Sequence, residues 1–203
     1  MSWLLKKNSA PNSQTLPDLI LTGKKVYLRP PRRSDWKEWG DIRRKNQVRL
    51  KPFEPSWPPN CLSADFFRRR LARQTRDWNE DRSYSFLICK SADASLIGGI
   101  NINNVIRGAA QFASLGYWID AEHEGQGYMK ESILLAVHYC FQSLDLHRVH
   151  AACIPGNDRS QNLLLSCGFK KEGYAEKYLK IDGKWQDHIL YGICKERFSF
   201  SPS

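Results

Sequence analysis

Apolar and polar positions in the first half of the chain predict one strand followed by two helices. The alternation at 25–29 is typical of a strand, which should end at the two prolines that follow. Ser34 and Asp35 can cap a first helix, expected to end before the proline-rich stretch 52–59. Ser63 can cap a second helix, whose arginines should lie largely on its outer face.

From residue 84 onward the pattern changes to short β-rich runs separated by turn residues. The elements expected, in order, are strands at 84–89, 96–102 and 115–119, a helix at 127–144, a strand at 148–154, a helix from Asn157 or Asp158 to Gly168, and strands at 174–181 and 184–193. The pair Asp182-Gly183 between the last two runs is a strong signal for a β-hairpin. This order predicts a mixed α/β fold of the α+β kind, with a largely antiparallel central sheet.

The length of the chain favours a single domain, because 203 residues with 41% hydrophobic content can bury one sizeable core. We expect a loosely ordered, flexible extension at 1–22, the folded domain at 23–198 and a short tail at 199–203. The sequence has no run of eighteen apolar residues and no apolar signal segment, so we expect a cytoplasmic protein without a membrane contact. Six scattered cysteines with no C-x-x-C pair are expected to be free thiols.

The net charge of +10 concerns partners rather than fold, because clustered cations attract polyanions. Much of this charge lies in two blocks, at 29–33 and in the arginine-rich stretch 68–76. Two interpretations stay open for these blocks: a solvated helix face, or a direct contact with RNA. The charge would also suit an enzyme with an anionic cofactor.

The sharpest motif is the loop 124–129 (E-G-Q-G-Y-M), which follows the run 115–119 and opens a predicted helix. A glycine-containing loop at a helix N-terminus presents unpaired amide groups and the positive end of the helix dipole, and both bind phosphate groups. The spacing is not that of a dinucleotide-binding fold, and the Gly-Lys-Ser/Thr of a P-loop is absent. The loop therefore indicates a phosphate-bearing ligand of another kind.

After this loop come a strand, the segment 155–160 (P-G-N-D-R-S), a short helix and Cys167-Gly168-Phe169. In this order, across roughly residues 25–195, the chain resembles the GNAT superfamily of acyl-CoA-dependent N-acetyltransferases. The stretches 146–148, 178–181 and 185–188 resemble specifically the RimJ group, which acetylates the N-terminal alanine of a small-subunit ribosomal protein. The resemblance implies a GNAT-like sheet with helices on both faces, acetyl-CoA as cosubstrate and no metal.

The resemblance also implies which residues bind coenzyme A. The pyrophosphate would be held by the backbone amides of Gly125, Gln126, Gly127, Tyr128 and Met129. The main chain of Trp118 and Ile119 would pair with the pantetheine amides like an added strand, and Asn157 and Ser160 would lie near the thioester. Glu124 and Met129 depart from the family pattern, which has Gln or Arg at the first position and commonly Gly or Ala at the second.

The implied chemistry is direct attack of a neutral amine on the thioester, which needs a proton acceptor for the amine and a proton donor for the thiolate. Many relatives have a tyrosine and a glutamate where this chain has Leu164 and Ala152, so the usual acid-base pair is missing. Ser160 is the candidate proton donor, with helix capping as its alternative role. Glu172 and His150 are the candidate bases, each with a structural role as its alternative.

No metal site is predicted at His147, His150 and Cys153, because a spacing of three residues on a strand directs neighbouring side chains to opposite faces. The number of subunits, one or two, stays open, as does binding to the ribosome itself.

The acceptor implied by the resemblance is a protein N-terminus, namely the N-terminal alanine of a ribosomal protein. Trp36, Trp39 and the aromatic-proline segment 52–57 would line the acceptor groove, or else pack in the core. One alternative is an acetyltransferase of small-molecule amines. The other is a non-catalytic module that binds acyl-CoA or RNA.

Overall fold

The computed structural model of the chain describes residues 15–200. Residues 1–14 of the expected extension and 201–203 of the expected tail lie outside this range. Among the described residues, no helix combines the length and the apolar character needed to cross a membrane. All six cysteines are described, and all are free thiols, as predicted.

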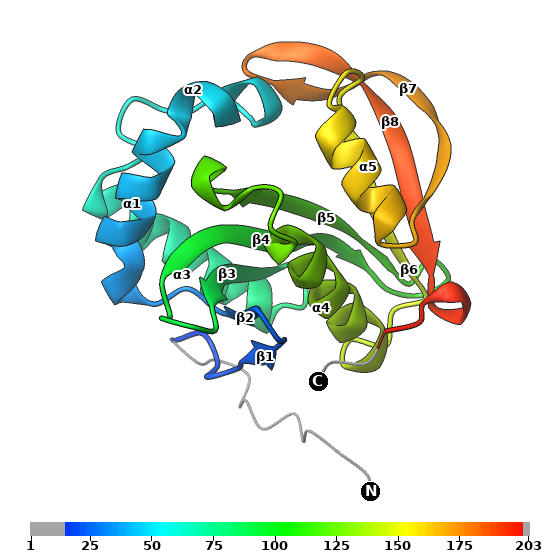
Figure 1. Ribbon diagram of the computed structural model, residues 1–203, viewed down its shortest axis with the longest axis horizontal. Coiled ribbons are helices and arrows are strands. Elements are labelled where there is room, and N and C mark those ends of the chain that lie inside the picture. Colours follow the sequence, from blue (N-terminus) through cyan, green and yellow to red (C-terminus); the bar gives the residue numbers. More distant parts are fainter. Residues whose placement is uncertain (1–14, 201–203) are drawn as a thin grey trace, which may run out of the picture.

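An eight-stranded sheet organises the fold (Figure 1). Its strands lie in the spatial order β1-β2-β3-β4-β5-β6-β8-β7, and every neighbouring pair is antiparallel except β5 and β6, which run parallel. The strands are β1 (Leu21–Thr22), β2 (Val26–Arg29), β3 (Tyr84–Lys90), β4 (Leu96–Ile106), β5 (Phe112–Ile119), β6 (Arg148–Cys153), β7 (Lys170–Ile181) and β8 (Lys184–Cys194). The predicted mixed fold with a largely antiparallel sheet is confirmed.

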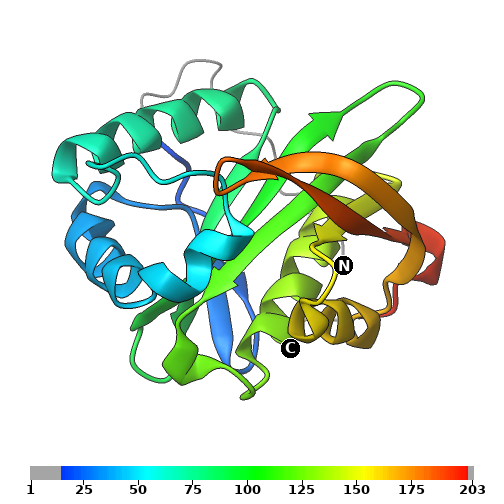
Figure 2. The same ribbon diagram turned by 90° about the horizontal axis from the view of Figure 1, so that it is seen from above.

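Helices cover both faces of the sheet, with α1 and α3 on one face and α4 and α5 on the other (Figure 2). The helices are α1 (Trp36–Lys45), α2 (Gln47–Leu50), α3 (Ala64–Asn79), α4 (Tyr128–Gln142) and α5 (Asp158–Ser166). Short 3-10 helices lie at η1 (Arg33–Asp35), η2 (Lys51–Phe53), η3 (Ala121–His123) and η4 (Lys195–Arg197).

Alternate residues of the central strands pack into two separate cores. In β3, Phe86 and Ile88 face the core that contains α4, whereas Leu87 and Cys89 face the core beneath α1 and α3. Successive side chains of a strand point to opposite faces, so a strand covered on both faces is apolar throughout. This double burial explains why 86–89 is a continuous apolar run instead of an alternating one.

Ser63 caps α3 as predicted, since its side-chain oxygen accepts a hydrogen bond from the Phe66 amide at 3.2 Å. Asp35 precedes α1, but its carboxylate makes no capping bond with that helix. It accepts hydrogen bonds from the Arg29 guanidinium (two, each 2.8 Å) and from the Arg32 amide (2.6 Å). Asp35 therefore occupies the predicted N-cap position of α1, but the Arg29 guanidinium and the Arg32 amide take up its carboxylate oxygens in place of an amide of that helix.

The arginines of α3 are not all on its outer face. Those exposed to solvent are Arg68, Arg69, Arg73 and Arg76. Arg70 instead is half-buried, with its guanidinium 5.7 Å from the centre of the Trp39 ring. Burial, together with the nearby Arg43 and Arg73, lowers the pKa of Arg70 to about 10. The prediction that these arginines lie largely on the outer face is therefore confirmed, and Arg70 is the exception because α1 packs against this part of α3.

The sheet begins earlier than the predicted boundary of the domain. Leu21 and Thr22 form β1 against β2, and the side chain of Leu21 packs on the core. The amides of Lys24, Lys25 and Val26 donate to the Glu131 carboxylate of α4 at 2.7, 2.9 and 3.1 Å. A two-residue strand is too short for an alternating pattern to indicate it, so the sequence pattern places this segment in the extension.

The predicted hairpin of β7 and β8 turns at Asp182 and Gly183, which both have positive φ angles of 43° and 80°. Two residues with positive φ match the twist of the flanking strands. The turn reaches across to η2 (Figure 1), where the Asp182 amide donates to the Glu54 carbonyl at 2.9 Å. The hairpin thereby connects the last strands of the sheet to the loop that follows α2.

Candidate functional site

β5 and β6 lie side by side only over their first residues. Their pairing runs from Phe112 opposite Arg148 to Leu115 opposite Ala151 and then stops. Beyond this point β5 stays paired with β4, and β6 with β8. The edge of β5 at 116–119 is therefore free to pair with another extended chain.

The loop that precedes α4 has the backbone of an anion-binding site. Gly125 and Gly127 have φ angles of 72° and 84°, a region that glycine adopts without steric cost. Gly127 is the N-cap of α4, so the amides of the first turn have no partner within the helix. The side chain of Met129 is buried in the core, which leaves this residue only its backbone for a ligand. The cofactor residues expected at 125–129 thus lie together at one helix end.

Lys25 adds a positive charge beside this loop, and the sequence alone did not point to it. Its ammonium group donates to the Gln126 carbonyl at 3.0 Å. A Cβ built on Gly127 would lie 3.6 Å from the same nitrogen. Lys25 precedes β2, about a hundred residues away in sequence, so only the folded chain brings it to the loop.

Two arginines neutralise Glu124, the acidic residue that departs from the family pattern. Arg49 of α2 pairs with one carboxylate oxygen, and Arg159 of α5 pairs with the other at 2.6 Å. Arg49 also donates to the Ile119 carbonyl. The negative charge that Glu124 brings to the loop is therefore balanced, and one main-chain acceptor at the end of β5 is already occupied.

Four side chains meet where β5 and β6 separate, at the start of α5. Asn157 is the N-cap of α5 and accepts a hydrogen bond from the Ser160 amide at 3.3 Å. The Ser160 hydroxyl lies 2.6 Å from the Tyr117 hydroxyl and accepts a hydrogen bond from the Cys153 thiol at 3.2 Å. The sequence did not single out Tyr117, which lies more than forty residues before Ser160.

Burial favours the protonated forms of Tyr117 and Cys153. It is the main cause that raises the pKa of Tyr117 well above its usual value, although the bond to Ser160 opposes the shift. Burial likewise raises the pKa of the Cys153 thiol. A neutral tyrosine that contacts a serine hydroxyl can pass a proton to an anion formed beside it.

Leu164 occupies the position at which many relatives have a tyrosine, and it is a core residue. Leu164 lies on α5 and is fully buried in the core that contains α4. This side chain has no polar atom and points into the core, so α5 presents no phenol to the space between β5 and β6. The Tyr117 hydroxyl supplies a phenol from a different element instead.

His150 and Glu172 lie on the other face of the sheet from Ser160. Cys153, which contacts Ser160, is an odd-numbered residue of β6 and packs in the α4 core, so His150 points the opposite way. Arg148 joins the two candidate bases, because it donates to His150 Nε2 and pairs with the Glu172 carboxylate. Burial, and then the charge of Arg148, lowers the pKa of His150, which favours the neutral imidazole.

The aromatic residues expected near an acceptor divide between surface and core. Trp39 is buried beneath α1, whereas Trp36 and Phe53 are 42% and 47% exposed. Trp57 of the proline-rich stretch lies against Arg43, whose guanidinium is 4.2 Å from its ring centre. Trp39 therefore packs in the core, which was one of its two predicted roles.

A polar strip follows the sheet on the face that carries Trp118. It consists of half-buried side chains from β4 and β5, namely Asn101, Asn103 and Ser114. Gly116 continues the strip at the point where β5 leaves β6, and a Cβ there would lie 3.4 Å from the Asn103 amide nitrogen. Polar groups that remain half-exposed on a sheet face can form hydrogen bonds with a polar acceptor substrate.

Comparisons with known proteins agree with this geometry. Residues 25–170 match the family described as "Acetyltransferase (GNAT) domain". The chain is 35% identical over 174 residues to "Probable N-acetyltransferase YjcK" of Bacillus subtilis, covering 86% of this chain and 96% of the relative. It is 33% identical over 178 residues to the [ribosomal protein uS5]-alanine N-acetyltransferase of Escherichia coli, covering 88% and 92%.

Among solved structures, Mycobacterium smegmatis RimJ in complex with CoA-disulfide superimposes with a TM-score of 0.82 at 31% identity. The match covers 87% of this chain and 85% of RimJ. A free strand edge beside a glycine loop and a helix N-terminus suits a ligand with amides and a pyrophosphate, so the residues present fit coenzyme A. The chain belongs to the GNAT acetyltransferase family and is an acyltransferase that uses acetyl-CoA.

Proposed function

We propose that this enzyme acetylates the N-terminal amine of a protein, and that its acceptor is a ribosomal protein that begins with alanine. The proposal is supported by the 33% identity to an enzyme named for alanine acetylation of ribosomal protein uS5. The structural observation that carries it is the polar strip of Asn101, Asn103 and Ser114, which ends where β5 and β6 separate. An extended N-terminal peptide has backbone groups that can pair with such a strip.

The cofactor would bind along the free edge of β5 and over the start of α4. The amides of 125–129 and the ammonium of Lys25 would hold the pyrophosphate, and the main chain of Trp118 and Ile119 would pair with pantetheine. Because Arg49 occupies the Ile119 carbonyl, pantetheine would have to displace it there or pair only with Trp118. Acetyl-CoA supplies an activated acyl group to the attacking amine.

Ser160 and Tyr117 would protonate the departing thiolate. The Ser160 hydroxyl lies at the start of α5, half-buried, and Tyr117 can restore its proton across the 2.6 Å contact. Asn157 fixes this turn by capping α5. The Asn157 side chain makes the cap bond of α5, which argues against helix capping as the role of the Ser160 hydroxyl.

On the opposite face, His150 and Glu172 would act as one proton-accepting unit bridged by Arg148. Because Arg148 donates to the Nε2 lone pair of His150, the Glu172 carboxylate would be the group of this unit that takes the proton of the acceptor amine, through water. Both carboxylate oxygens of Glu172 lie over Gly192, beside the Arg148 guanidinium. With the base on one face of the sheet and the acid on the other, the amine would lose its proton on one side and the thiolate would gain one on the opposite side.

The proposed acceptor is tested by measuring thiol release from acetyl-CoA with peptides that begin with Ala, Ser or Met. The same Ala peptide with a blocked N-terminus is the matched control, and a panel of small amines covers the alternative substrate class. Turnover restricted to free Ala or Ser N-termini is expected. Turnover of small amines alone would contradict a protein acceptor while leaving the acyltransferase activity intact.

A further inference from the structure

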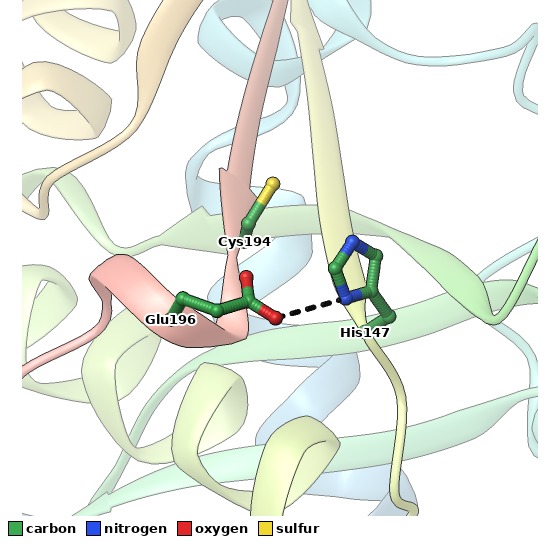
Figure 3. Close-up of side chains that lie close together, drawn as sticks. All are labelled: His147, Cys194 and Glu196. Atoms are coloured by element: carbon green, nitrogen blue, oxygen red, sulfur yellow. Dashed lines mark ion pairs between the residues drawn. The ribbon is translucent and has the colours of Figure 1, made fainter.

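Three potential metal ligands gather where β6 begins and β8 ends. They are His147 just before β6, Cys194 at the end of β8 and Glu196 in η4 (Figure 3). Their coordinating atoms all lie within 4.8 Å of one another. We infer that His147, Cys194 and Glu196 form a binding site for a divalent cation of the zinc class.

The backbone already holds these residues in place. Cys194 is directly opposite Arg148 in the antiparallel pairing of β6 and β8. The next amide, that of Lys195, donates to the His147 carbonyl at 3.0 Å. A cation would therefore need only side-chain rotation, because the strand pairing has fixed the spacing of the main chain.

The distances suit zinc after a small adjustment. His147 Nδ1 and Glu196 Oε1 are 3.3 Å apart, as the dashed line in Figure 3 marks. Zinc binds nitrogen, oxygen and sulfur donors at about 2.0–2.3 Å, so two donors of a tetrahedral site lie roughly 3.3–3.8 Å apart. The imidazole and the carboxylate are at this spacing already, and the thiol has to approach by about 1 Å.

The donor set selects the class of ion. Thiolate and imidazole ligands favour zinc and related transition metals, whereas magnesium and calcium prefer oxygen ligands. The exposed His147 and Glu196 leave the site open, so water can fill the remaining coordination position. Three protein ligands with an open position give a weaker site than the four ligands of a closed structural one.

Two guanidinium groups also contact the thiol. They favour its thiolate form but also repel a metal cation. Arg148 Nη1 and Arg197 Nη2 lie 3.2 and 3.8 Å from Cys194 Sγ, where their N–H groups stabilise a thiolate. Their charge opposes a second cation, but the pair that Arg148 forms with Glu172 balances part of it. A thiolate and the Glu196 carboxylate together carry two negative charges, which match one divalent ion.

The inferred site lies at the other end of β6 from Ser160, and Arg148 connects its Cys194 thiol to the proposed base Glu172. Cys194 pairs with the first residue of β6, whereas Cys153, which contacts Ser160, is the last residue of that strand. A bound ion would tie the start of β6 to the end of β8 and to η4. Its expected effect is therefore on stability.

The test uses the full chain without an affinity tag, stripped of metal with a chelator. Zinc is titrated in competition with a chromophoric chelator, and cobalt is added separately to record a thiolate-to-cobalt charge-transfer band. We expect one equivalent of zinc per chain, a raised Tm on zinc addition, and a cobalt band. Cys194→Ser and Glu196→Gln should each weaken zinc binding at least about tenfold, and Cys194→Ser should abolish the band.

Cys61→Ser is the matched control, because Cys61 is another half-buried free thiol but lies in the loop before α3. It should bind zinc and cobalt like the parent chain. Unchanged acetyl-CoA binding verifies that each variant is folded. Zinc binding no tighter in the parent chain than in the Cys194→Ser/Glu196→Gln double variant, or lost equally in Cys61→Ser, would overturn the inference.

Discussion

The Tyr117 hydroxyl lies 2.6 Å from the Ser160 hydroxyl, which joins the free end of β5 to the first turn of α5. The two residues are 43 positions apart in the chain. The contact stands at the separation of β5 and β6, and it gives this enzyme a phenol where α5 itself carries Leu164.

We predict that both hydroxyls contribute to the chemical step. Ser160→Ala should lower kcat about 100-fold, because it removes the group proposed to protonate the thiolate. Tyr117→Phe should lower kcat about tenfold, the effect of losing one hydrogen bond to that group. Steady-state kinetics check both, with the KM for acetyl-CoA expected to change little.

Tyr191→Phe is the matched control for this pair, because Tyr191 is also buried and bonds a residue of α5, Gln161, at 3.1 Å. Its kcat should remain close to that of the parent enzyme. A Ser160→Ala enzyme with normal kcat would leave Ser160 with a structural role only.

Glu124 is expected to weaken cofactor binding by its charge, even though Arg49 and Arg159 balance it. Glu124→Gln should lower the Kd for acetyl-CoA about threefold at low salt, since both arginines are then free to attract phosphate groups. The gain should shrink at high salt because the charges are partly exposed. Calorimetric titration at two salt concentrations measures this.

Glu122→Gln serves as the comparison for Glu124, because it removes an equal charge from the same loop where Lys45 is the partner. A rise in Kd for Glu124→Gln would mean that the bridge between α2 and α5 matters more than the charge.

Arg43 is predicted to hold the contact between η2 and the β7–β8 hairpin. Its guanidinium makes two hydrogen bonds to the Glu54 carboxylate, and the Glu54 carbonyl accepts from the Asp182 amide. Arg43→Lys keeps the charge but loses the two-pronged geometry and the stacking on Trp57. Hydrogen exchange at the hairpin turn should accelerate about tenfold, as mass spectrometry of the exchanged amides would record.

The adjacent Arg44 provides a control for Arg43, since its partner Asp41 is exposed on the same helix. Arg44→Lys should leave exchange at the hairpin unchanged. Equal acceleration in both variants would point to a general loosening of α1.

His138 is predicted to make stability fall in mildly acidic solution. Burial lowers the pKa of His138, and a hydrogen bond with the Phe200 backbone opposes this shift to a smaller extent. The folded state therefore favours the neutral ring. When a histidine has a lower pKa folded than unfolded, its protonation costs stability as the pH falls below the unfolded value of about 6.5. The loss is complete once the pH is below the folded pKa.

Chemical denaturation from pH 7.5 to 5.5 should therefore show a decline that is smaller in His138→Gln. The exposed His147 offers a comparison, because His147→Gln without added metal should follow the decline of the parent chain. A His138→Gln profile parallel to that of the parent would assign the pH dependence to other groups.

Much of the fold was predictable because local patterns dictate it. The alternation at β2, the cap at Ser63, the helical stripe of α4 and the Asp-Gly turn depend on neighbouring residues and simple periodicity. The glycine loop before α4 was recognisable for the same reason, since its chemistry resides in consecutive backbone amides. Short or tertiary-dependent features such as β1 and the carboxylate of Asp35 were not.

The side-chain site depended on contacts between distant segments. Tyr117 reaches Ser160 only because β5 and β6 separate after Leu115, which no local pattern encodes. Lys25 likewise reaches the glycine loop only in the folded chain.

By itself the sequence determined the order of the elements, the phosphate-binding loop and the enzyme family, since these follow from periodicity and from motifs of adjacent residues. Only the tertiary structure decided that Ser160 shares its hydrogen bond with Tyr117, that His150 and Glu172 meet at Arg148 on the other face, and that His147 lies beside Glu196. The reason is physical: hydrogen bonds and ion pairs act over a few ångströms, and strand pairing alone brings residues far apart in sequence to that distance.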